Sequence, residues 1–434
     1  MSELRPPIGW SVRRLGEITE VVSGGTPSRE NPSFWENGTI PWATPTDITD
    51  CNSRLLASTA DRITPKGLRS CAARLLPPAS LLMTSRATLG EIRVAATEIC
   101  TNQGFKSLVP TPLIDNWYLF YQMQFSKPRY SVLGKGSTFL EVNTGDTQSF
   151  PILYAPLPEQ HKIARILESV DNLIEKTEAL IAKYQAVKQG MMHDLFTRGV
   201  DEHGHLRPSC AEAPSLYKQS ELGWIPKEWR VAVMVDLTLK IVDGVHHTPE
   251  YVEHGIPFVT VKNLTQSDGI DWQELNYITE LDHSAFILRA DPKPGDVLVT
   301  KDGTLGVARI VPKNVRPFSI FVSVALLRPN PAKCLSKLIW LFFDSGTYLC
   351  QMGRLSAGTG LKHIHLEHFR EFRVATPPLD EQDRMFVRLD ASGSNLLRER
   401  AHLQKLHKIK TGLMQDLLTG KVRVKIDEED VAHV

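Results

Sequence analysis

The chain has 434 residues, of which 42% are hydrophobic and 23% charged, and its formal net charge is +1. This length exceeds what one ordinary hydrophobic core supports, so at least two domains are predicted. A net charge this close to zero excludes binding of nucleic acid through bulk charge, and a nucleic-acid partner would have to meet local basic surface.

Neither a membrane segment nor a disulfide framework is indicated. No apolar run approaches the roughly 20 residues that a membrane helix needs, and Met1 to Trp10 does not resemble a signal peptide. We therefore expect a cytoplasmic protein with no membrane partner. The six cysteines are scattered without a CxxC pair, which predicts reduced, mostly structural thiols and no zinc site.

In chain order, residues 1–155 are predicted to form a first mixed α/β domain, because short β-branched runs alternate there with Pro and Gly turn signals. Residues 156–198 are predicted to form a long helix, since no Gly or Pro occurs between Pro158 and Gly190. Apolar residues recur in it at steps of four and three, as in a coiled coil. This seam consists of Ile163, Leu167, Val170, Ile174, Thr177, Ile181 and Tyr184.

The second half of the chain repeats this order. Residues 199–221 are polar and rich in breakers, which predicts a tether. Residues 222–377 are predicted to form a second mixed α/β domain, residues 378–420 a second long helix, and residues 421–434 a tail. The seam of the second helix is Met385, Leu389, Ser392, Leu396, Glu399, Leu403 and Leu406. Because SGS at Ser392 to Ser394 disfavours a helix, we expect a local irregularity there.

An internal repeat explains this order. GMMHDLFTRGV at Gly190 to Val200 returns as GLMQDLLTGKV at Gly412 to Val422, an offset of 222 positions. The same offset carries APLPEQ onto PPLDEQ. Upstream, an offset of 216 carries IPWATPTDIT onto IPFVTVKNLT and LMTSRATLGEIRV onto LVTKDGTLGVARI. Repeats of this length predict two similar domains.

The two helices are expected to bury their seams against each other. A parallel pair would crowd both domains at one end, so an antiparallel coiled coil with an approximate two-fold relation between the repeats is predicted. The fold class is therefore α/β (α+β), with two similar mixed α/β domains separated by two long helices.

The order of these segments resembles the specificity subunit of type I restriction-modification systems. The stretches that carry the resemblance are SGGTPSR, IPWATPTDI, PLPEQHKIARIL, the helix ending DLFTRGV, YKQSELGWIPKEWRV and the second helix ending DLLTGKV. Together they cover essentially the whole chain. The resemblance implies that each domain recognises one half of a bipartite site in double-stranded DNA.

The resemblance also implies partners. Two adenine methyltransferase subunits would dock on the helices, and two restriction subunits, which combine motor and nuclease, would join them for cleavage. It implies that this chain binds no cofactor and has no catalytic residues. S-adenosylmethionine would be used by the methylation subunits, and ATP with Mg by the restriction subunits.

The residues that could contact DNA are of two kinds. Between residues 54 and 93, the seven basic residues Arg54, Arg62, Lys66, Arg69, Arg74, Arg86 and Arg93 face only two acidic ones, which suits phosphate contact as well as an ordinary solvated surface. Base-reading candidates in predicted loops are Thr44, Thr46, Asp47, Arg86, Asn102, Gln103, and, by alignment of the repeats, Thr260, Lys262, Asn263, Lys301 and Asp302. Turn or strand roles stay open for each of them.

Partner docking is predicted on the helix faces that repeat most faithfully. The candidate residues are Lys183, Lys188 and Asp194 in the first helix and Lys405, Lys410 and Asp416 in the second. Repetition of one face predicts two copies of one methylation subunit.

Two other classes of protein remain as alternatives. A stand-alone DNA methyltransferase would need a strand, glycine-rich loop and helix for the methyl donor, and NPSF at Asn31 to Phe34 follows no such unit. A coiled-coil adaptor that binds no DNA is disfavoured by the basic cluster. GKGST at Gly134 to Thr138 and its counterpart SAGTG at Ser356 to Gly360 are predicted to be loops of the domains. The histidines in HIHLEH (His363, His365 and His368) are expected to be structural or surface residues and not metal ligands, because the first repeat lacks them.

Overall fold

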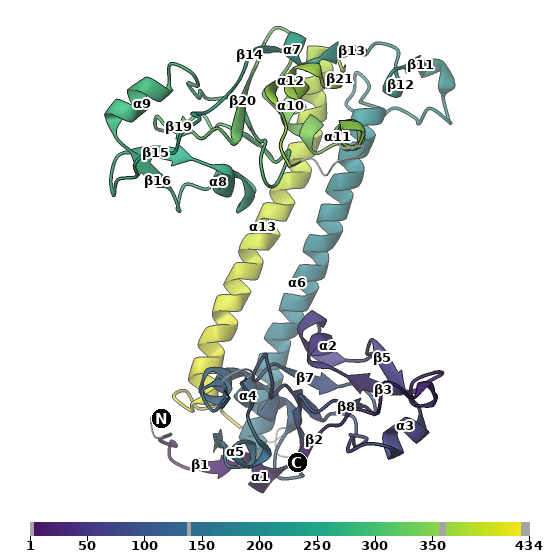
Figure 1. Cartoon of the computed structure of the whole chain (residues 1–434), viewed down its shortest axis with the longest axis vertical. Coiled ribbons are helices and arrows are strands. Elements are labelled where there is room, and N and C mark those ends of the chain that lie inside the picture. Colours follow the sequence, from purple (N-terminus) through teal and green to yellow (C-terminus); the bar gives the residue numbers. More distant parts are fainter. Residues whose placement is uncertain (1–3, 137–139, 356–361, 427–434) are drawn as a thin grey trace. The chain divides into compact units, whose positions relative to one another are not determined.

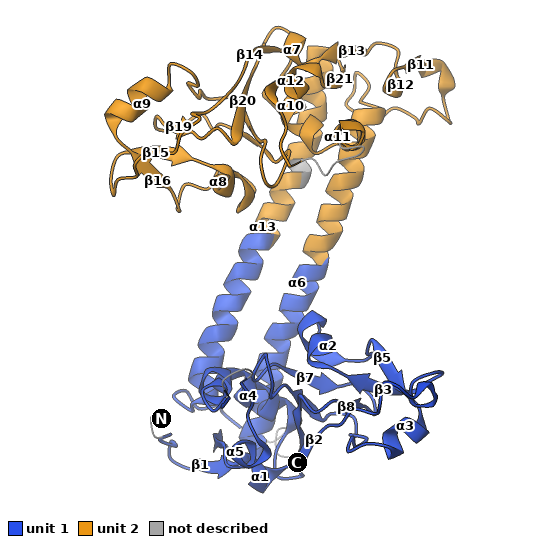
Figure 2. Ribbon diagram, in the orientation of Figure 1, with its two compact units in different colours: residues 1–179, 400–434 blue, residues 180–399 orange. Residues whose placement is uncertain are grey.

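The computed structural model of the chain describes residues 4–136, 140–355 and 362–426. The chain divides into two compact units, drawn in two colours in Figure 2. Unit 1 contains Met1–Ala179 and Arg400–Val434, and unit 2 contains Leu180–Glu399. Each unit therefore combines one mixed α/β domain with one half of each long helix, and the predicted fold class is confirmed (Figure 1).

Unit 1 is built on a five-stranded sheet in the order β2-β9-β6-β7-β4 and a three-stranded sheet in the order β5-β3-β8. A two-stranded ribbon pairs β1 with β10. The strands are β1 (Ser11–Arg14), β2 (Thr19–Ser23), β3 (Ile40–Ala43), β4 (Leu55–Leu56), β5 (Asp61–Ile63), β6 (Leu81–Met83), β7 (Ile92–Ala95), β8 (Cys100–Thr101), β9 (Lys106–Pro110) and β10 (Pro151–Tyr154). The short helices are α1 (Leu15–Ile18), η1 (Pro32–Phe34), α2 (Pro45–Asp50), α3 (Pro65–Arg69), α4 (Asn116–Ser131) and α5 (Thr144–Gln148).

Unit 2 repeats this plan. Its main sheet has the order β14-β20-β17-β18, its second sheet the order β16-β15-β19, and β13 pairs with β21. The strands are β11 (Tyr217–Ser220), β12 (Gly223–Pro226), β13 (Arg230–Val233), β14 (Thr238–Asp243), β15 (Ile256–Val259), β16 (Asn276–Ile278), β17 (Val297–Thr300), β18 (Ala308–Ile310), β19 (Ser319–Ile320), β20 (Val324–Pro329) and β21 (Arg373–Thr376). The short helices are η2 (Pro214–Leu216), α7 (Met234–Leu237), α8 (Val261–Thr265), α9 (Glu280–Phe286), α10 (Ser336–Phe343), α11 (Gly346–Leu355) and α12 (Leu366–Glu371).

The register of the strands shows the same repeat at residue level. In unit 1, Leu81 of β6 pairs with Leu108 of β9, and in unit 2, Val297 of β17 pairs with Leu327 of β20. In both units the second sheet combines one antiparallel and one parallel pairing. Two similar domains, as the internal repeat predicts, are therefore present.

The long helices are α6 (Leu157–Thr197) and α13 (Leu379–Leu418). In unit 1, Ile163 and Leu167 from the start of α6 belong to the same buried cluster as Leu417 from the end of α13. In unit 2, Met385 from the start of α13 shares a cluster with Leu195 from the end of α6. Because the start of one helix packs with the end of the other in each unit, the predicted antiparallel arrangement is confirmed.

The irregularity expected in the second helix is absent. Helix α13 continues through residues 392–394 without interruption. The glycine costs about 1 kcal/mol of helix propensity. Leu389 and Leu396, on either side of this segment, are both buried, and packing of such a face stabilises a helix more than propensity does. Burial therefore outweighs the local preference, and the expectation was wrong.

The duplicated glutamine of the PEQ and DEQ motifs fastens each long helix to its own domain. Gln160 in unit 1 accepts a hydrogen bond from the Asp115 amide at 2.9 Å and donates to a carbonyl at 2.8 Å. Gln382 in unit 2 accepts from the Leu335 amide at 2.9 Å and likewise donates to a carbonyl at 2.9 Å. Both glutamines are fully buried, so the motif is repeated because both helices start with the same anchor.

The glutamate beside each glutamine binds an arginine that follows the end of the other helix. The carboxylate of Glu159 accepts hydrogen bonds from Arg423 Nε at 2.9 Å and from the indole N–H of Trp10 at 3.1 Å. Glu381 receives Arg207 Nη2 at 3.0 Å. Arg207 lies in the segment that the sequence predicted to be a polar tether, so this segment makes specific contacts within unit 2. Its continuation forms the β11–β12 hairpin.

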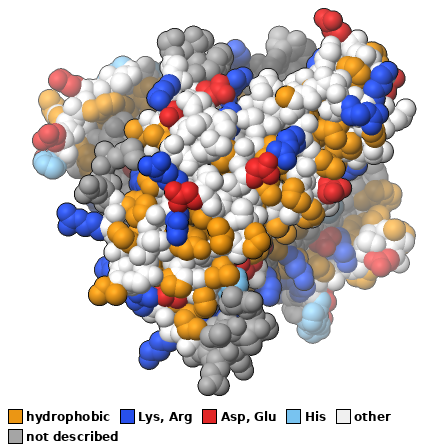
Figure 3. All heavy atoms as spheres, turned by 90° about the horizontal axis from the view of Figure 1, so that it is seen from below, with side chains coloured by type: hydrophobic (Ala, Val, Ile, Leu, Met, Phe, Trp, Pro, Cys, Tyr) orange, Lys and Arg blue, Asp and Glu red, His pale blue; other side chains and the backbone are white. Residues whose placement is uncertain are grey.

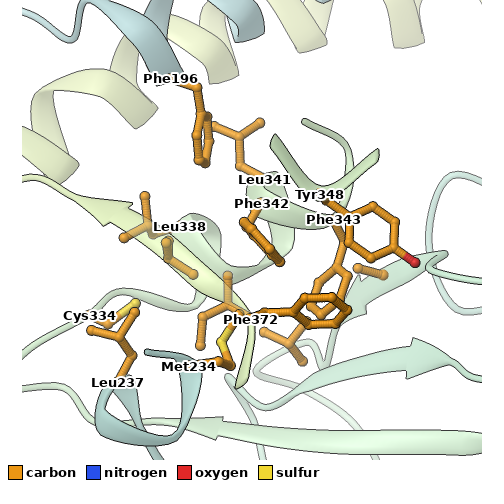
Figure 4. Packing of buried hydrophobic residues seen from close by; sticks show 14 of the residues in the cluster. Phe196, Met234, Leu237, Cys334, Leu338, Leu341, Phe342, Phe343, Tyr348 and Phe372 are labelled. Carbon is orange, nitrogen blue, oxygen red and sulfur yellow. The ribbon is translucent and has the colours of Figure 1, made fainter. Parts of the chain in front are cut away.

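Aromatic side chains form the centre of the core of unit 2 (Figure 4). The ring centroids of Phe342 and Phe343 in α10 are 5.2 Å apart, and the ring centroid of Tyr348 in α11 is 5.1 Å from that of Phe343. Phe196, near the end of α6, packs in the same cluster. The repeated helix ending therefore inserts its apolar residues into the core of a domain.

Candidate nucleic-acid interface

The first pair of predicted base-reading loops follows β3 in unit 1 and β15 in unit 2. In unit 1, the amide and the hydroxyl of Thr44 donate to Asp47 Oδ2 at 2.7 and 2.6 Å. In unit 2, Thr260 donates in the same way to Asn263 Oδ1 at 2.9 and 3.1 Å. These four side chains form capping boxes that start α2 and α8. Their polar groups therefore already have partners within the protein.

Of the six candidates in these two segments, only Thr46 and Lys262 are exposed, and they occupy equivalent positions. The structure places both in the first turns of the helices α2 and α8, so the prediction that they lie in loops was wrong. Lys262 forms an ion pair with Glu274 at 2.8 Å, and both side chains are exposed. Exposed pairs of this kind are weak and exchange readily with other partners. Thr46 and Lys262 are thus the candidates in these two helix starts that a ligand could reach.

The loop after β8 carries Asn102 and Gln103. Asn102 Oδ1 accepts from the Gly104 amide at 2.8 Å, which fixes the turn. Gln103 is exposed and its side chain binds the hydroxyl of Thr26. Of the two predicted readers, Asn102 has a turn role in the structure, and Gln103 reaches the surface.

Lys301 lies in a buried ionic cluster that the sequence did not indicate. Its ammonium is 2.9 Å from Asp243 Oδ2, and both side chains are almost fully buried. The guanidinium of Arg289 also binds Asp243, and Nε2 of His246 lies 3.3 Å from Oδ1 of Asp243. Although burial opposes ionisation, hydrogen bonds from Arg289 and Lys301 hold the pKa of Asp243 below its usual range. Lys301 is therefore engaged within unit 2.

The remaining predicted readers, Arg86 and Asp302, are half-exposed and occupy equivalent positions after β6 and β17. Arg86 binds Glu141 through Nε and Nη2, at 3.1 and 2.6 Å. The hydrogen bond from Arg86 lowers the pKa of Glu141. Asp302 binds the Nδ1 atom of His363. Sequence reasoning missed Glu141 and His363 as partners, although the offset of 222 aligns them with each other.

The basic cluster between residues 54 and 93 is divided by the fold. Arg54 binds Glu175 and Asn172 of α6, at 2.9 and 2.6 Å, and Arg93 donates to the carbonyl of Cys51 at 2.6 Å. These two arginines hold parts of unit 1 together. The exposed members of the cluster are Arg62, Lys66, Arg69 and Arg74. Phosphate contact is therefore a prediction for this smaller group, around β5 and α3.

Basic and acidic side chains are interspersed on the face of the molecule shown in Figure 3. This mixture agrees with the net charge of +1. Attraction of a polyanion to this face would therefore depend on short-range contacts of individual side chains, because interspersed charges cancel beyond a Debye length of about 10 Å.

The six candidates for partner docking differ in exposure. Lys183 and Lys405 are exposed. Lys410 forms an ion pair with Asp171 at 2.8 Å, and the Nζ atom of Lys188 lies 5.5 Å from the ring centroid of Trp340. Asp194 and Asp416 are half-buried beside basic residues of their own helix ends, Arg198 and Lys421.

The segments that could have indicated methyl transfer, phosphate binding or metal binding show no such site among the described residues. Asn31, at the start of NPSF, caps the short helix η1. Ser137 and Thr138 of GKGST, and all of SAGTG, lie outside the described residues. Among residues 4–136, 140–355 and 362–426, no group of three or more His, Cys, Asp or Glu side chains could hold a metal ion. All six cysteines are unpaired.

No helix within residues 4–136, 140–355 and 362–426 combines the length and hydrophobicity that a bilayer crossing requires.

Comparison with known proteins identifies the family. Residues 7–184 and 249–408 each match the family described as "Type I restriction modification DNA specificity domain". The type I restriction enzyme MjaIX specificity subunit of Methanocaldococcus jannaschii is 26% identical over 428 residues, which cover 96% of this chain and 95% of the relative. The MjaVIII specificity subunit of the same organism is 25% identical over 430 residues, covering 98% and 96%.

A solved structure shares the fold. The S subunit of a type I restriction-modification system from M. genitalium superposes with a TM-score of 0.57 at 16% sequence identity, and the match covers 96% of this chain and 97% of that one. Since the two family matches together span well over half of the sequence, the chain belongs to the family of type I restriction-modification DNA specificity subunits.

Proposed function

We propose that this chain is the non-catalytic subunit that selects the DNA sequence for a type I restriction-modification complex, and that each of its domains reads one half of a bipartite site. One observation supports this most directly. The two domains have the same scaffold, yet equivalent positions present different side chains, such as Thr46 and Lys262, or Arg86 and Asp302. Different side chains at equivalent positions of the same scaffold suit the reading of two different half-sites.

The helices are proposed to dock two copies of an adenine methyltransferase subunit. Lys183 in unit 2 and Lys405 in unit 1 are exposed at positions related by the internal repeat. Each unit therefore offers one copy of the same face. Two restriction subunits are proposed to join this assembly for cleavage, with S-adenosylmethionine and ATP with Mg used by the partners.

A domain exchange tests the division of labour. Residues 217–377 are replaced by the matching segment of a relative with a different DNA site, and methylated adenines are mapped genome-wide before and after the exchange. We expect one half of the motif to change and the other half to stay. A change of both halves together would show that recognition is a joint property of the two domains.

The same cells provide a test against the alternative of a stand-alone methyltransferase. Expression of the chain without methylation subunits should leave no methylated motif, whereas expression with them should produce it. Methylation by the chain alone would contradict the proposal.

A further inference from the structure

The loops that connect β6 to β7 and β17 to β18 have one backbone structure with two different side chains at the tip. In unit 1, the Gly90 amide donates to the Thr84 carbonyl at 2.8 Å, and in unit 2 the Gly306 amide donates to the Thr300 carbonyl at 2.9 Å. The hydroxyl of each threonine accepts from the amide that follows the glycine, at 3.0 and 2.9 Å. The two loops therefore hold their tips in the same way.

Each tip also contains a residue in the left-handed region of backbone conformation. Gly303 has a φ of 68°, and Ala87, at the equivalent position, has a φ of 63°. Glycine adopts this conformation freely, whereas alanine does so only against a steric penalty. Strain that persists in a non-glycine residue is found most often at functional loops. The residues directly before Ala87 and Gly303 are Arg86 and Asp302.

Arg86 and Asp302 carry opposite charges, and their partners differ in chemical type although the two pairs are arranged in the same way. An antiparallel bridge places Arg86 beside Glu141, and the equivalent bridge places Asp302 beside His363. A basic residue is thus held by an acidic one in unit 1, and an acidic residue by an imidazole in unit 2. Because the scaffold is the same, this inversion is a difference in surface chemistry and not in fold.

Both pairs remain accessible. The side chains of Arg86 and Asp302 are 41% and 37% exposed. Glu141 binds one edge of the guanidinium, so N–H donors on Nη1 and Nη2 can still bind a ligand. His363 binds Oδ1 of Asp302, and Oδ2 can still accept a hydrogen bond. Each pair therefore offers an oriented group with unused hydrogen-bonding capacity.

These groups match different edges of base pairs. An arginine can donate two hydrogen bonds to O6 and N7 of guanine in the major groove, and a carboxylate accepts from the N4 amino group of cytosine. We propose that Arg86 and Asp302 are specificity-determining residues at equivalent positions of the two half-sites, Arg86 reading a guanine and Asp302 a cytosine. Glu141 and His363 are positioning residues that orient them. This inference rests on the proposed function, because it assumes that each domain reads one half-site.

The test is selection of bound sequences from a randomised DNA library by the full chain in complex with its methylation subunits. In Arg86→Gln, preference at one position of one half-site should change from guanine to adenine, because glutamine pairs with adenine. In Asp302→Asn, preference at one position of the other half-site should change from cytosine to adenine for the same reason. Discrimination at these positions should fall by about ten-fold or more in Arg86→Ala and Asp302→Ala.

Arg13→Ala is the matched control. Arg13 also lies in unit 1, is exposed and pairs with an acidic residue, Glu17, at 3.7 Å, but neither belongs to the loop tip or to the basic cluster. It should leave the base preferences of both half-sites unchanged. Glu141→Gln tests the positioning role: the guanine preference should weaken at the position that Arg86 reads and at no other. Thermal unfolding midpoints verify that each variant is folded.

The possible results distinguish a failure of the proposed function from a failure of the roles inferred for Arg86 and Asp302. If the wild-type complex selects no bipartite sequence, the proposed function is wrong. If it selects one, but folded variants of Arg86 and Asp302 leave every base preference unchanged, or weaken binding to all sequences equally, only this inference is overturned. A change of the same half-site by both substitutions would also overturn it.

Discussion

Asp243 and Lys301 form an ion pair that is almost completely buried in unit 2. Charges removed from water are costly unless each retains its partner. Asp243 satisfies this condition twice, since the side chains of Lys301 and Arg289 both bind it. Lys301 directly precedes Asp302 in the chain, so this pair fixes the backbone next to the candidate DNA-reading residue.

Asp243→Asn is predicted to lower the free energy of unfolding by about 3 kcal/mol at neutral pH, because the buried charge of Lys301 loses its counter-charge. The pKa of Asp243 in the folded protein lies below its unfolded value of about 3.9. Its stabilising contribution is therefore complete above the unfolded pKa and is lost as the pH falls through the folded pKa. The difference between wild type and variant should shrink below about pH 4 in urea unfolding experiments.

Asp291→Asn is the control for this experiment. Asp291 pairs with Lys293 at 3.1 Å, and the two side chains are 40% and 59% exposed. Such a pair contributes less than about 1 kcal/mol. A difference for Asp243→Asn that stayed constant down to about pH 3 would show that the pair does not stabilise the unit through its charge.

At the scale of elements, the ends of the long helices are the most closely repeated feature. Gly199 and Gly420, which follow α6 and α13, have φ values of 62° and 67°. A Cβ atom at Gly199 would lie 2.2 Å from Oε1 of Glu381 and 2.5 Å from the ring of Trp229. This glycine therefore ends α6 and also leaves space for the buried carboxylate of Glu381 at the start of α13.

Gly199→Ala is predicted to lower the free energy of unfolding by about 2 kcal/mol or more, since left-handed strain adds to the contact with Glu381. Gly190→Ala, at a position within α6 itself, is the matched control. No atom lies within 4 Å of a Cβ placed at Gly190, which is exposed, so this change should raise stability by up to about 1 kcal/mol. Urea unfolding of both variants measures the effects. Equal effects would contradict the structural role of Gly199.

At the scale of the whole molecule, the internal repeat has a consequence for assembly. Lys183 belongs to unit 2 and Lys405 to unit 1, and both are exposed on a long helix. A partner that binds one of these faces therefore meets the same residue type in the other unit. Two equivalent faces predict two bound copies of one partner.

We predict that the wild-type chain binds two methylation subunits at saturation, measured by native mass spectrometry. Lys183→Glu should weaken binding of one copy by about ten-fold or more, through repulsion in place of attraction, and the double variant Lys183→Glu with Lys405→Glu should weaken both. Lys218→Glu, at an exposed position on β11, is the control and should bind two copies. A wild-type complex with a single copy would refute the prediction.

Particular residues show how much of the candidate site could be predicted. Position 86 could be chosen from the sequence because arginine is a common reader of guanine and lies in a predicted loop. Its partner Glu141 is 55 positions away in the chain, and no local pattern connects them. The polar groups of Thr44 and Asp47 suggest base contacts in the sequence, whereas in the structure they form the cap of α2. A capping box has its own sequence signature, so this role was readable.

The sequence by itself determined the two repeats, the two long helices with their seams, and the family. These features depend on local periodicity and on similarity between segments, both of which are present in the order of residues. The tertiary structure decided which polar residues are buried and which are exposed. Lys301 and Lys262 read alike as basic loop residues, yet Asp243, far away in the chain, buries the first, while the second is exposed beside Glu274. That difference arises from pairing between distant strands, because burial depends on which segments the sheets bring together.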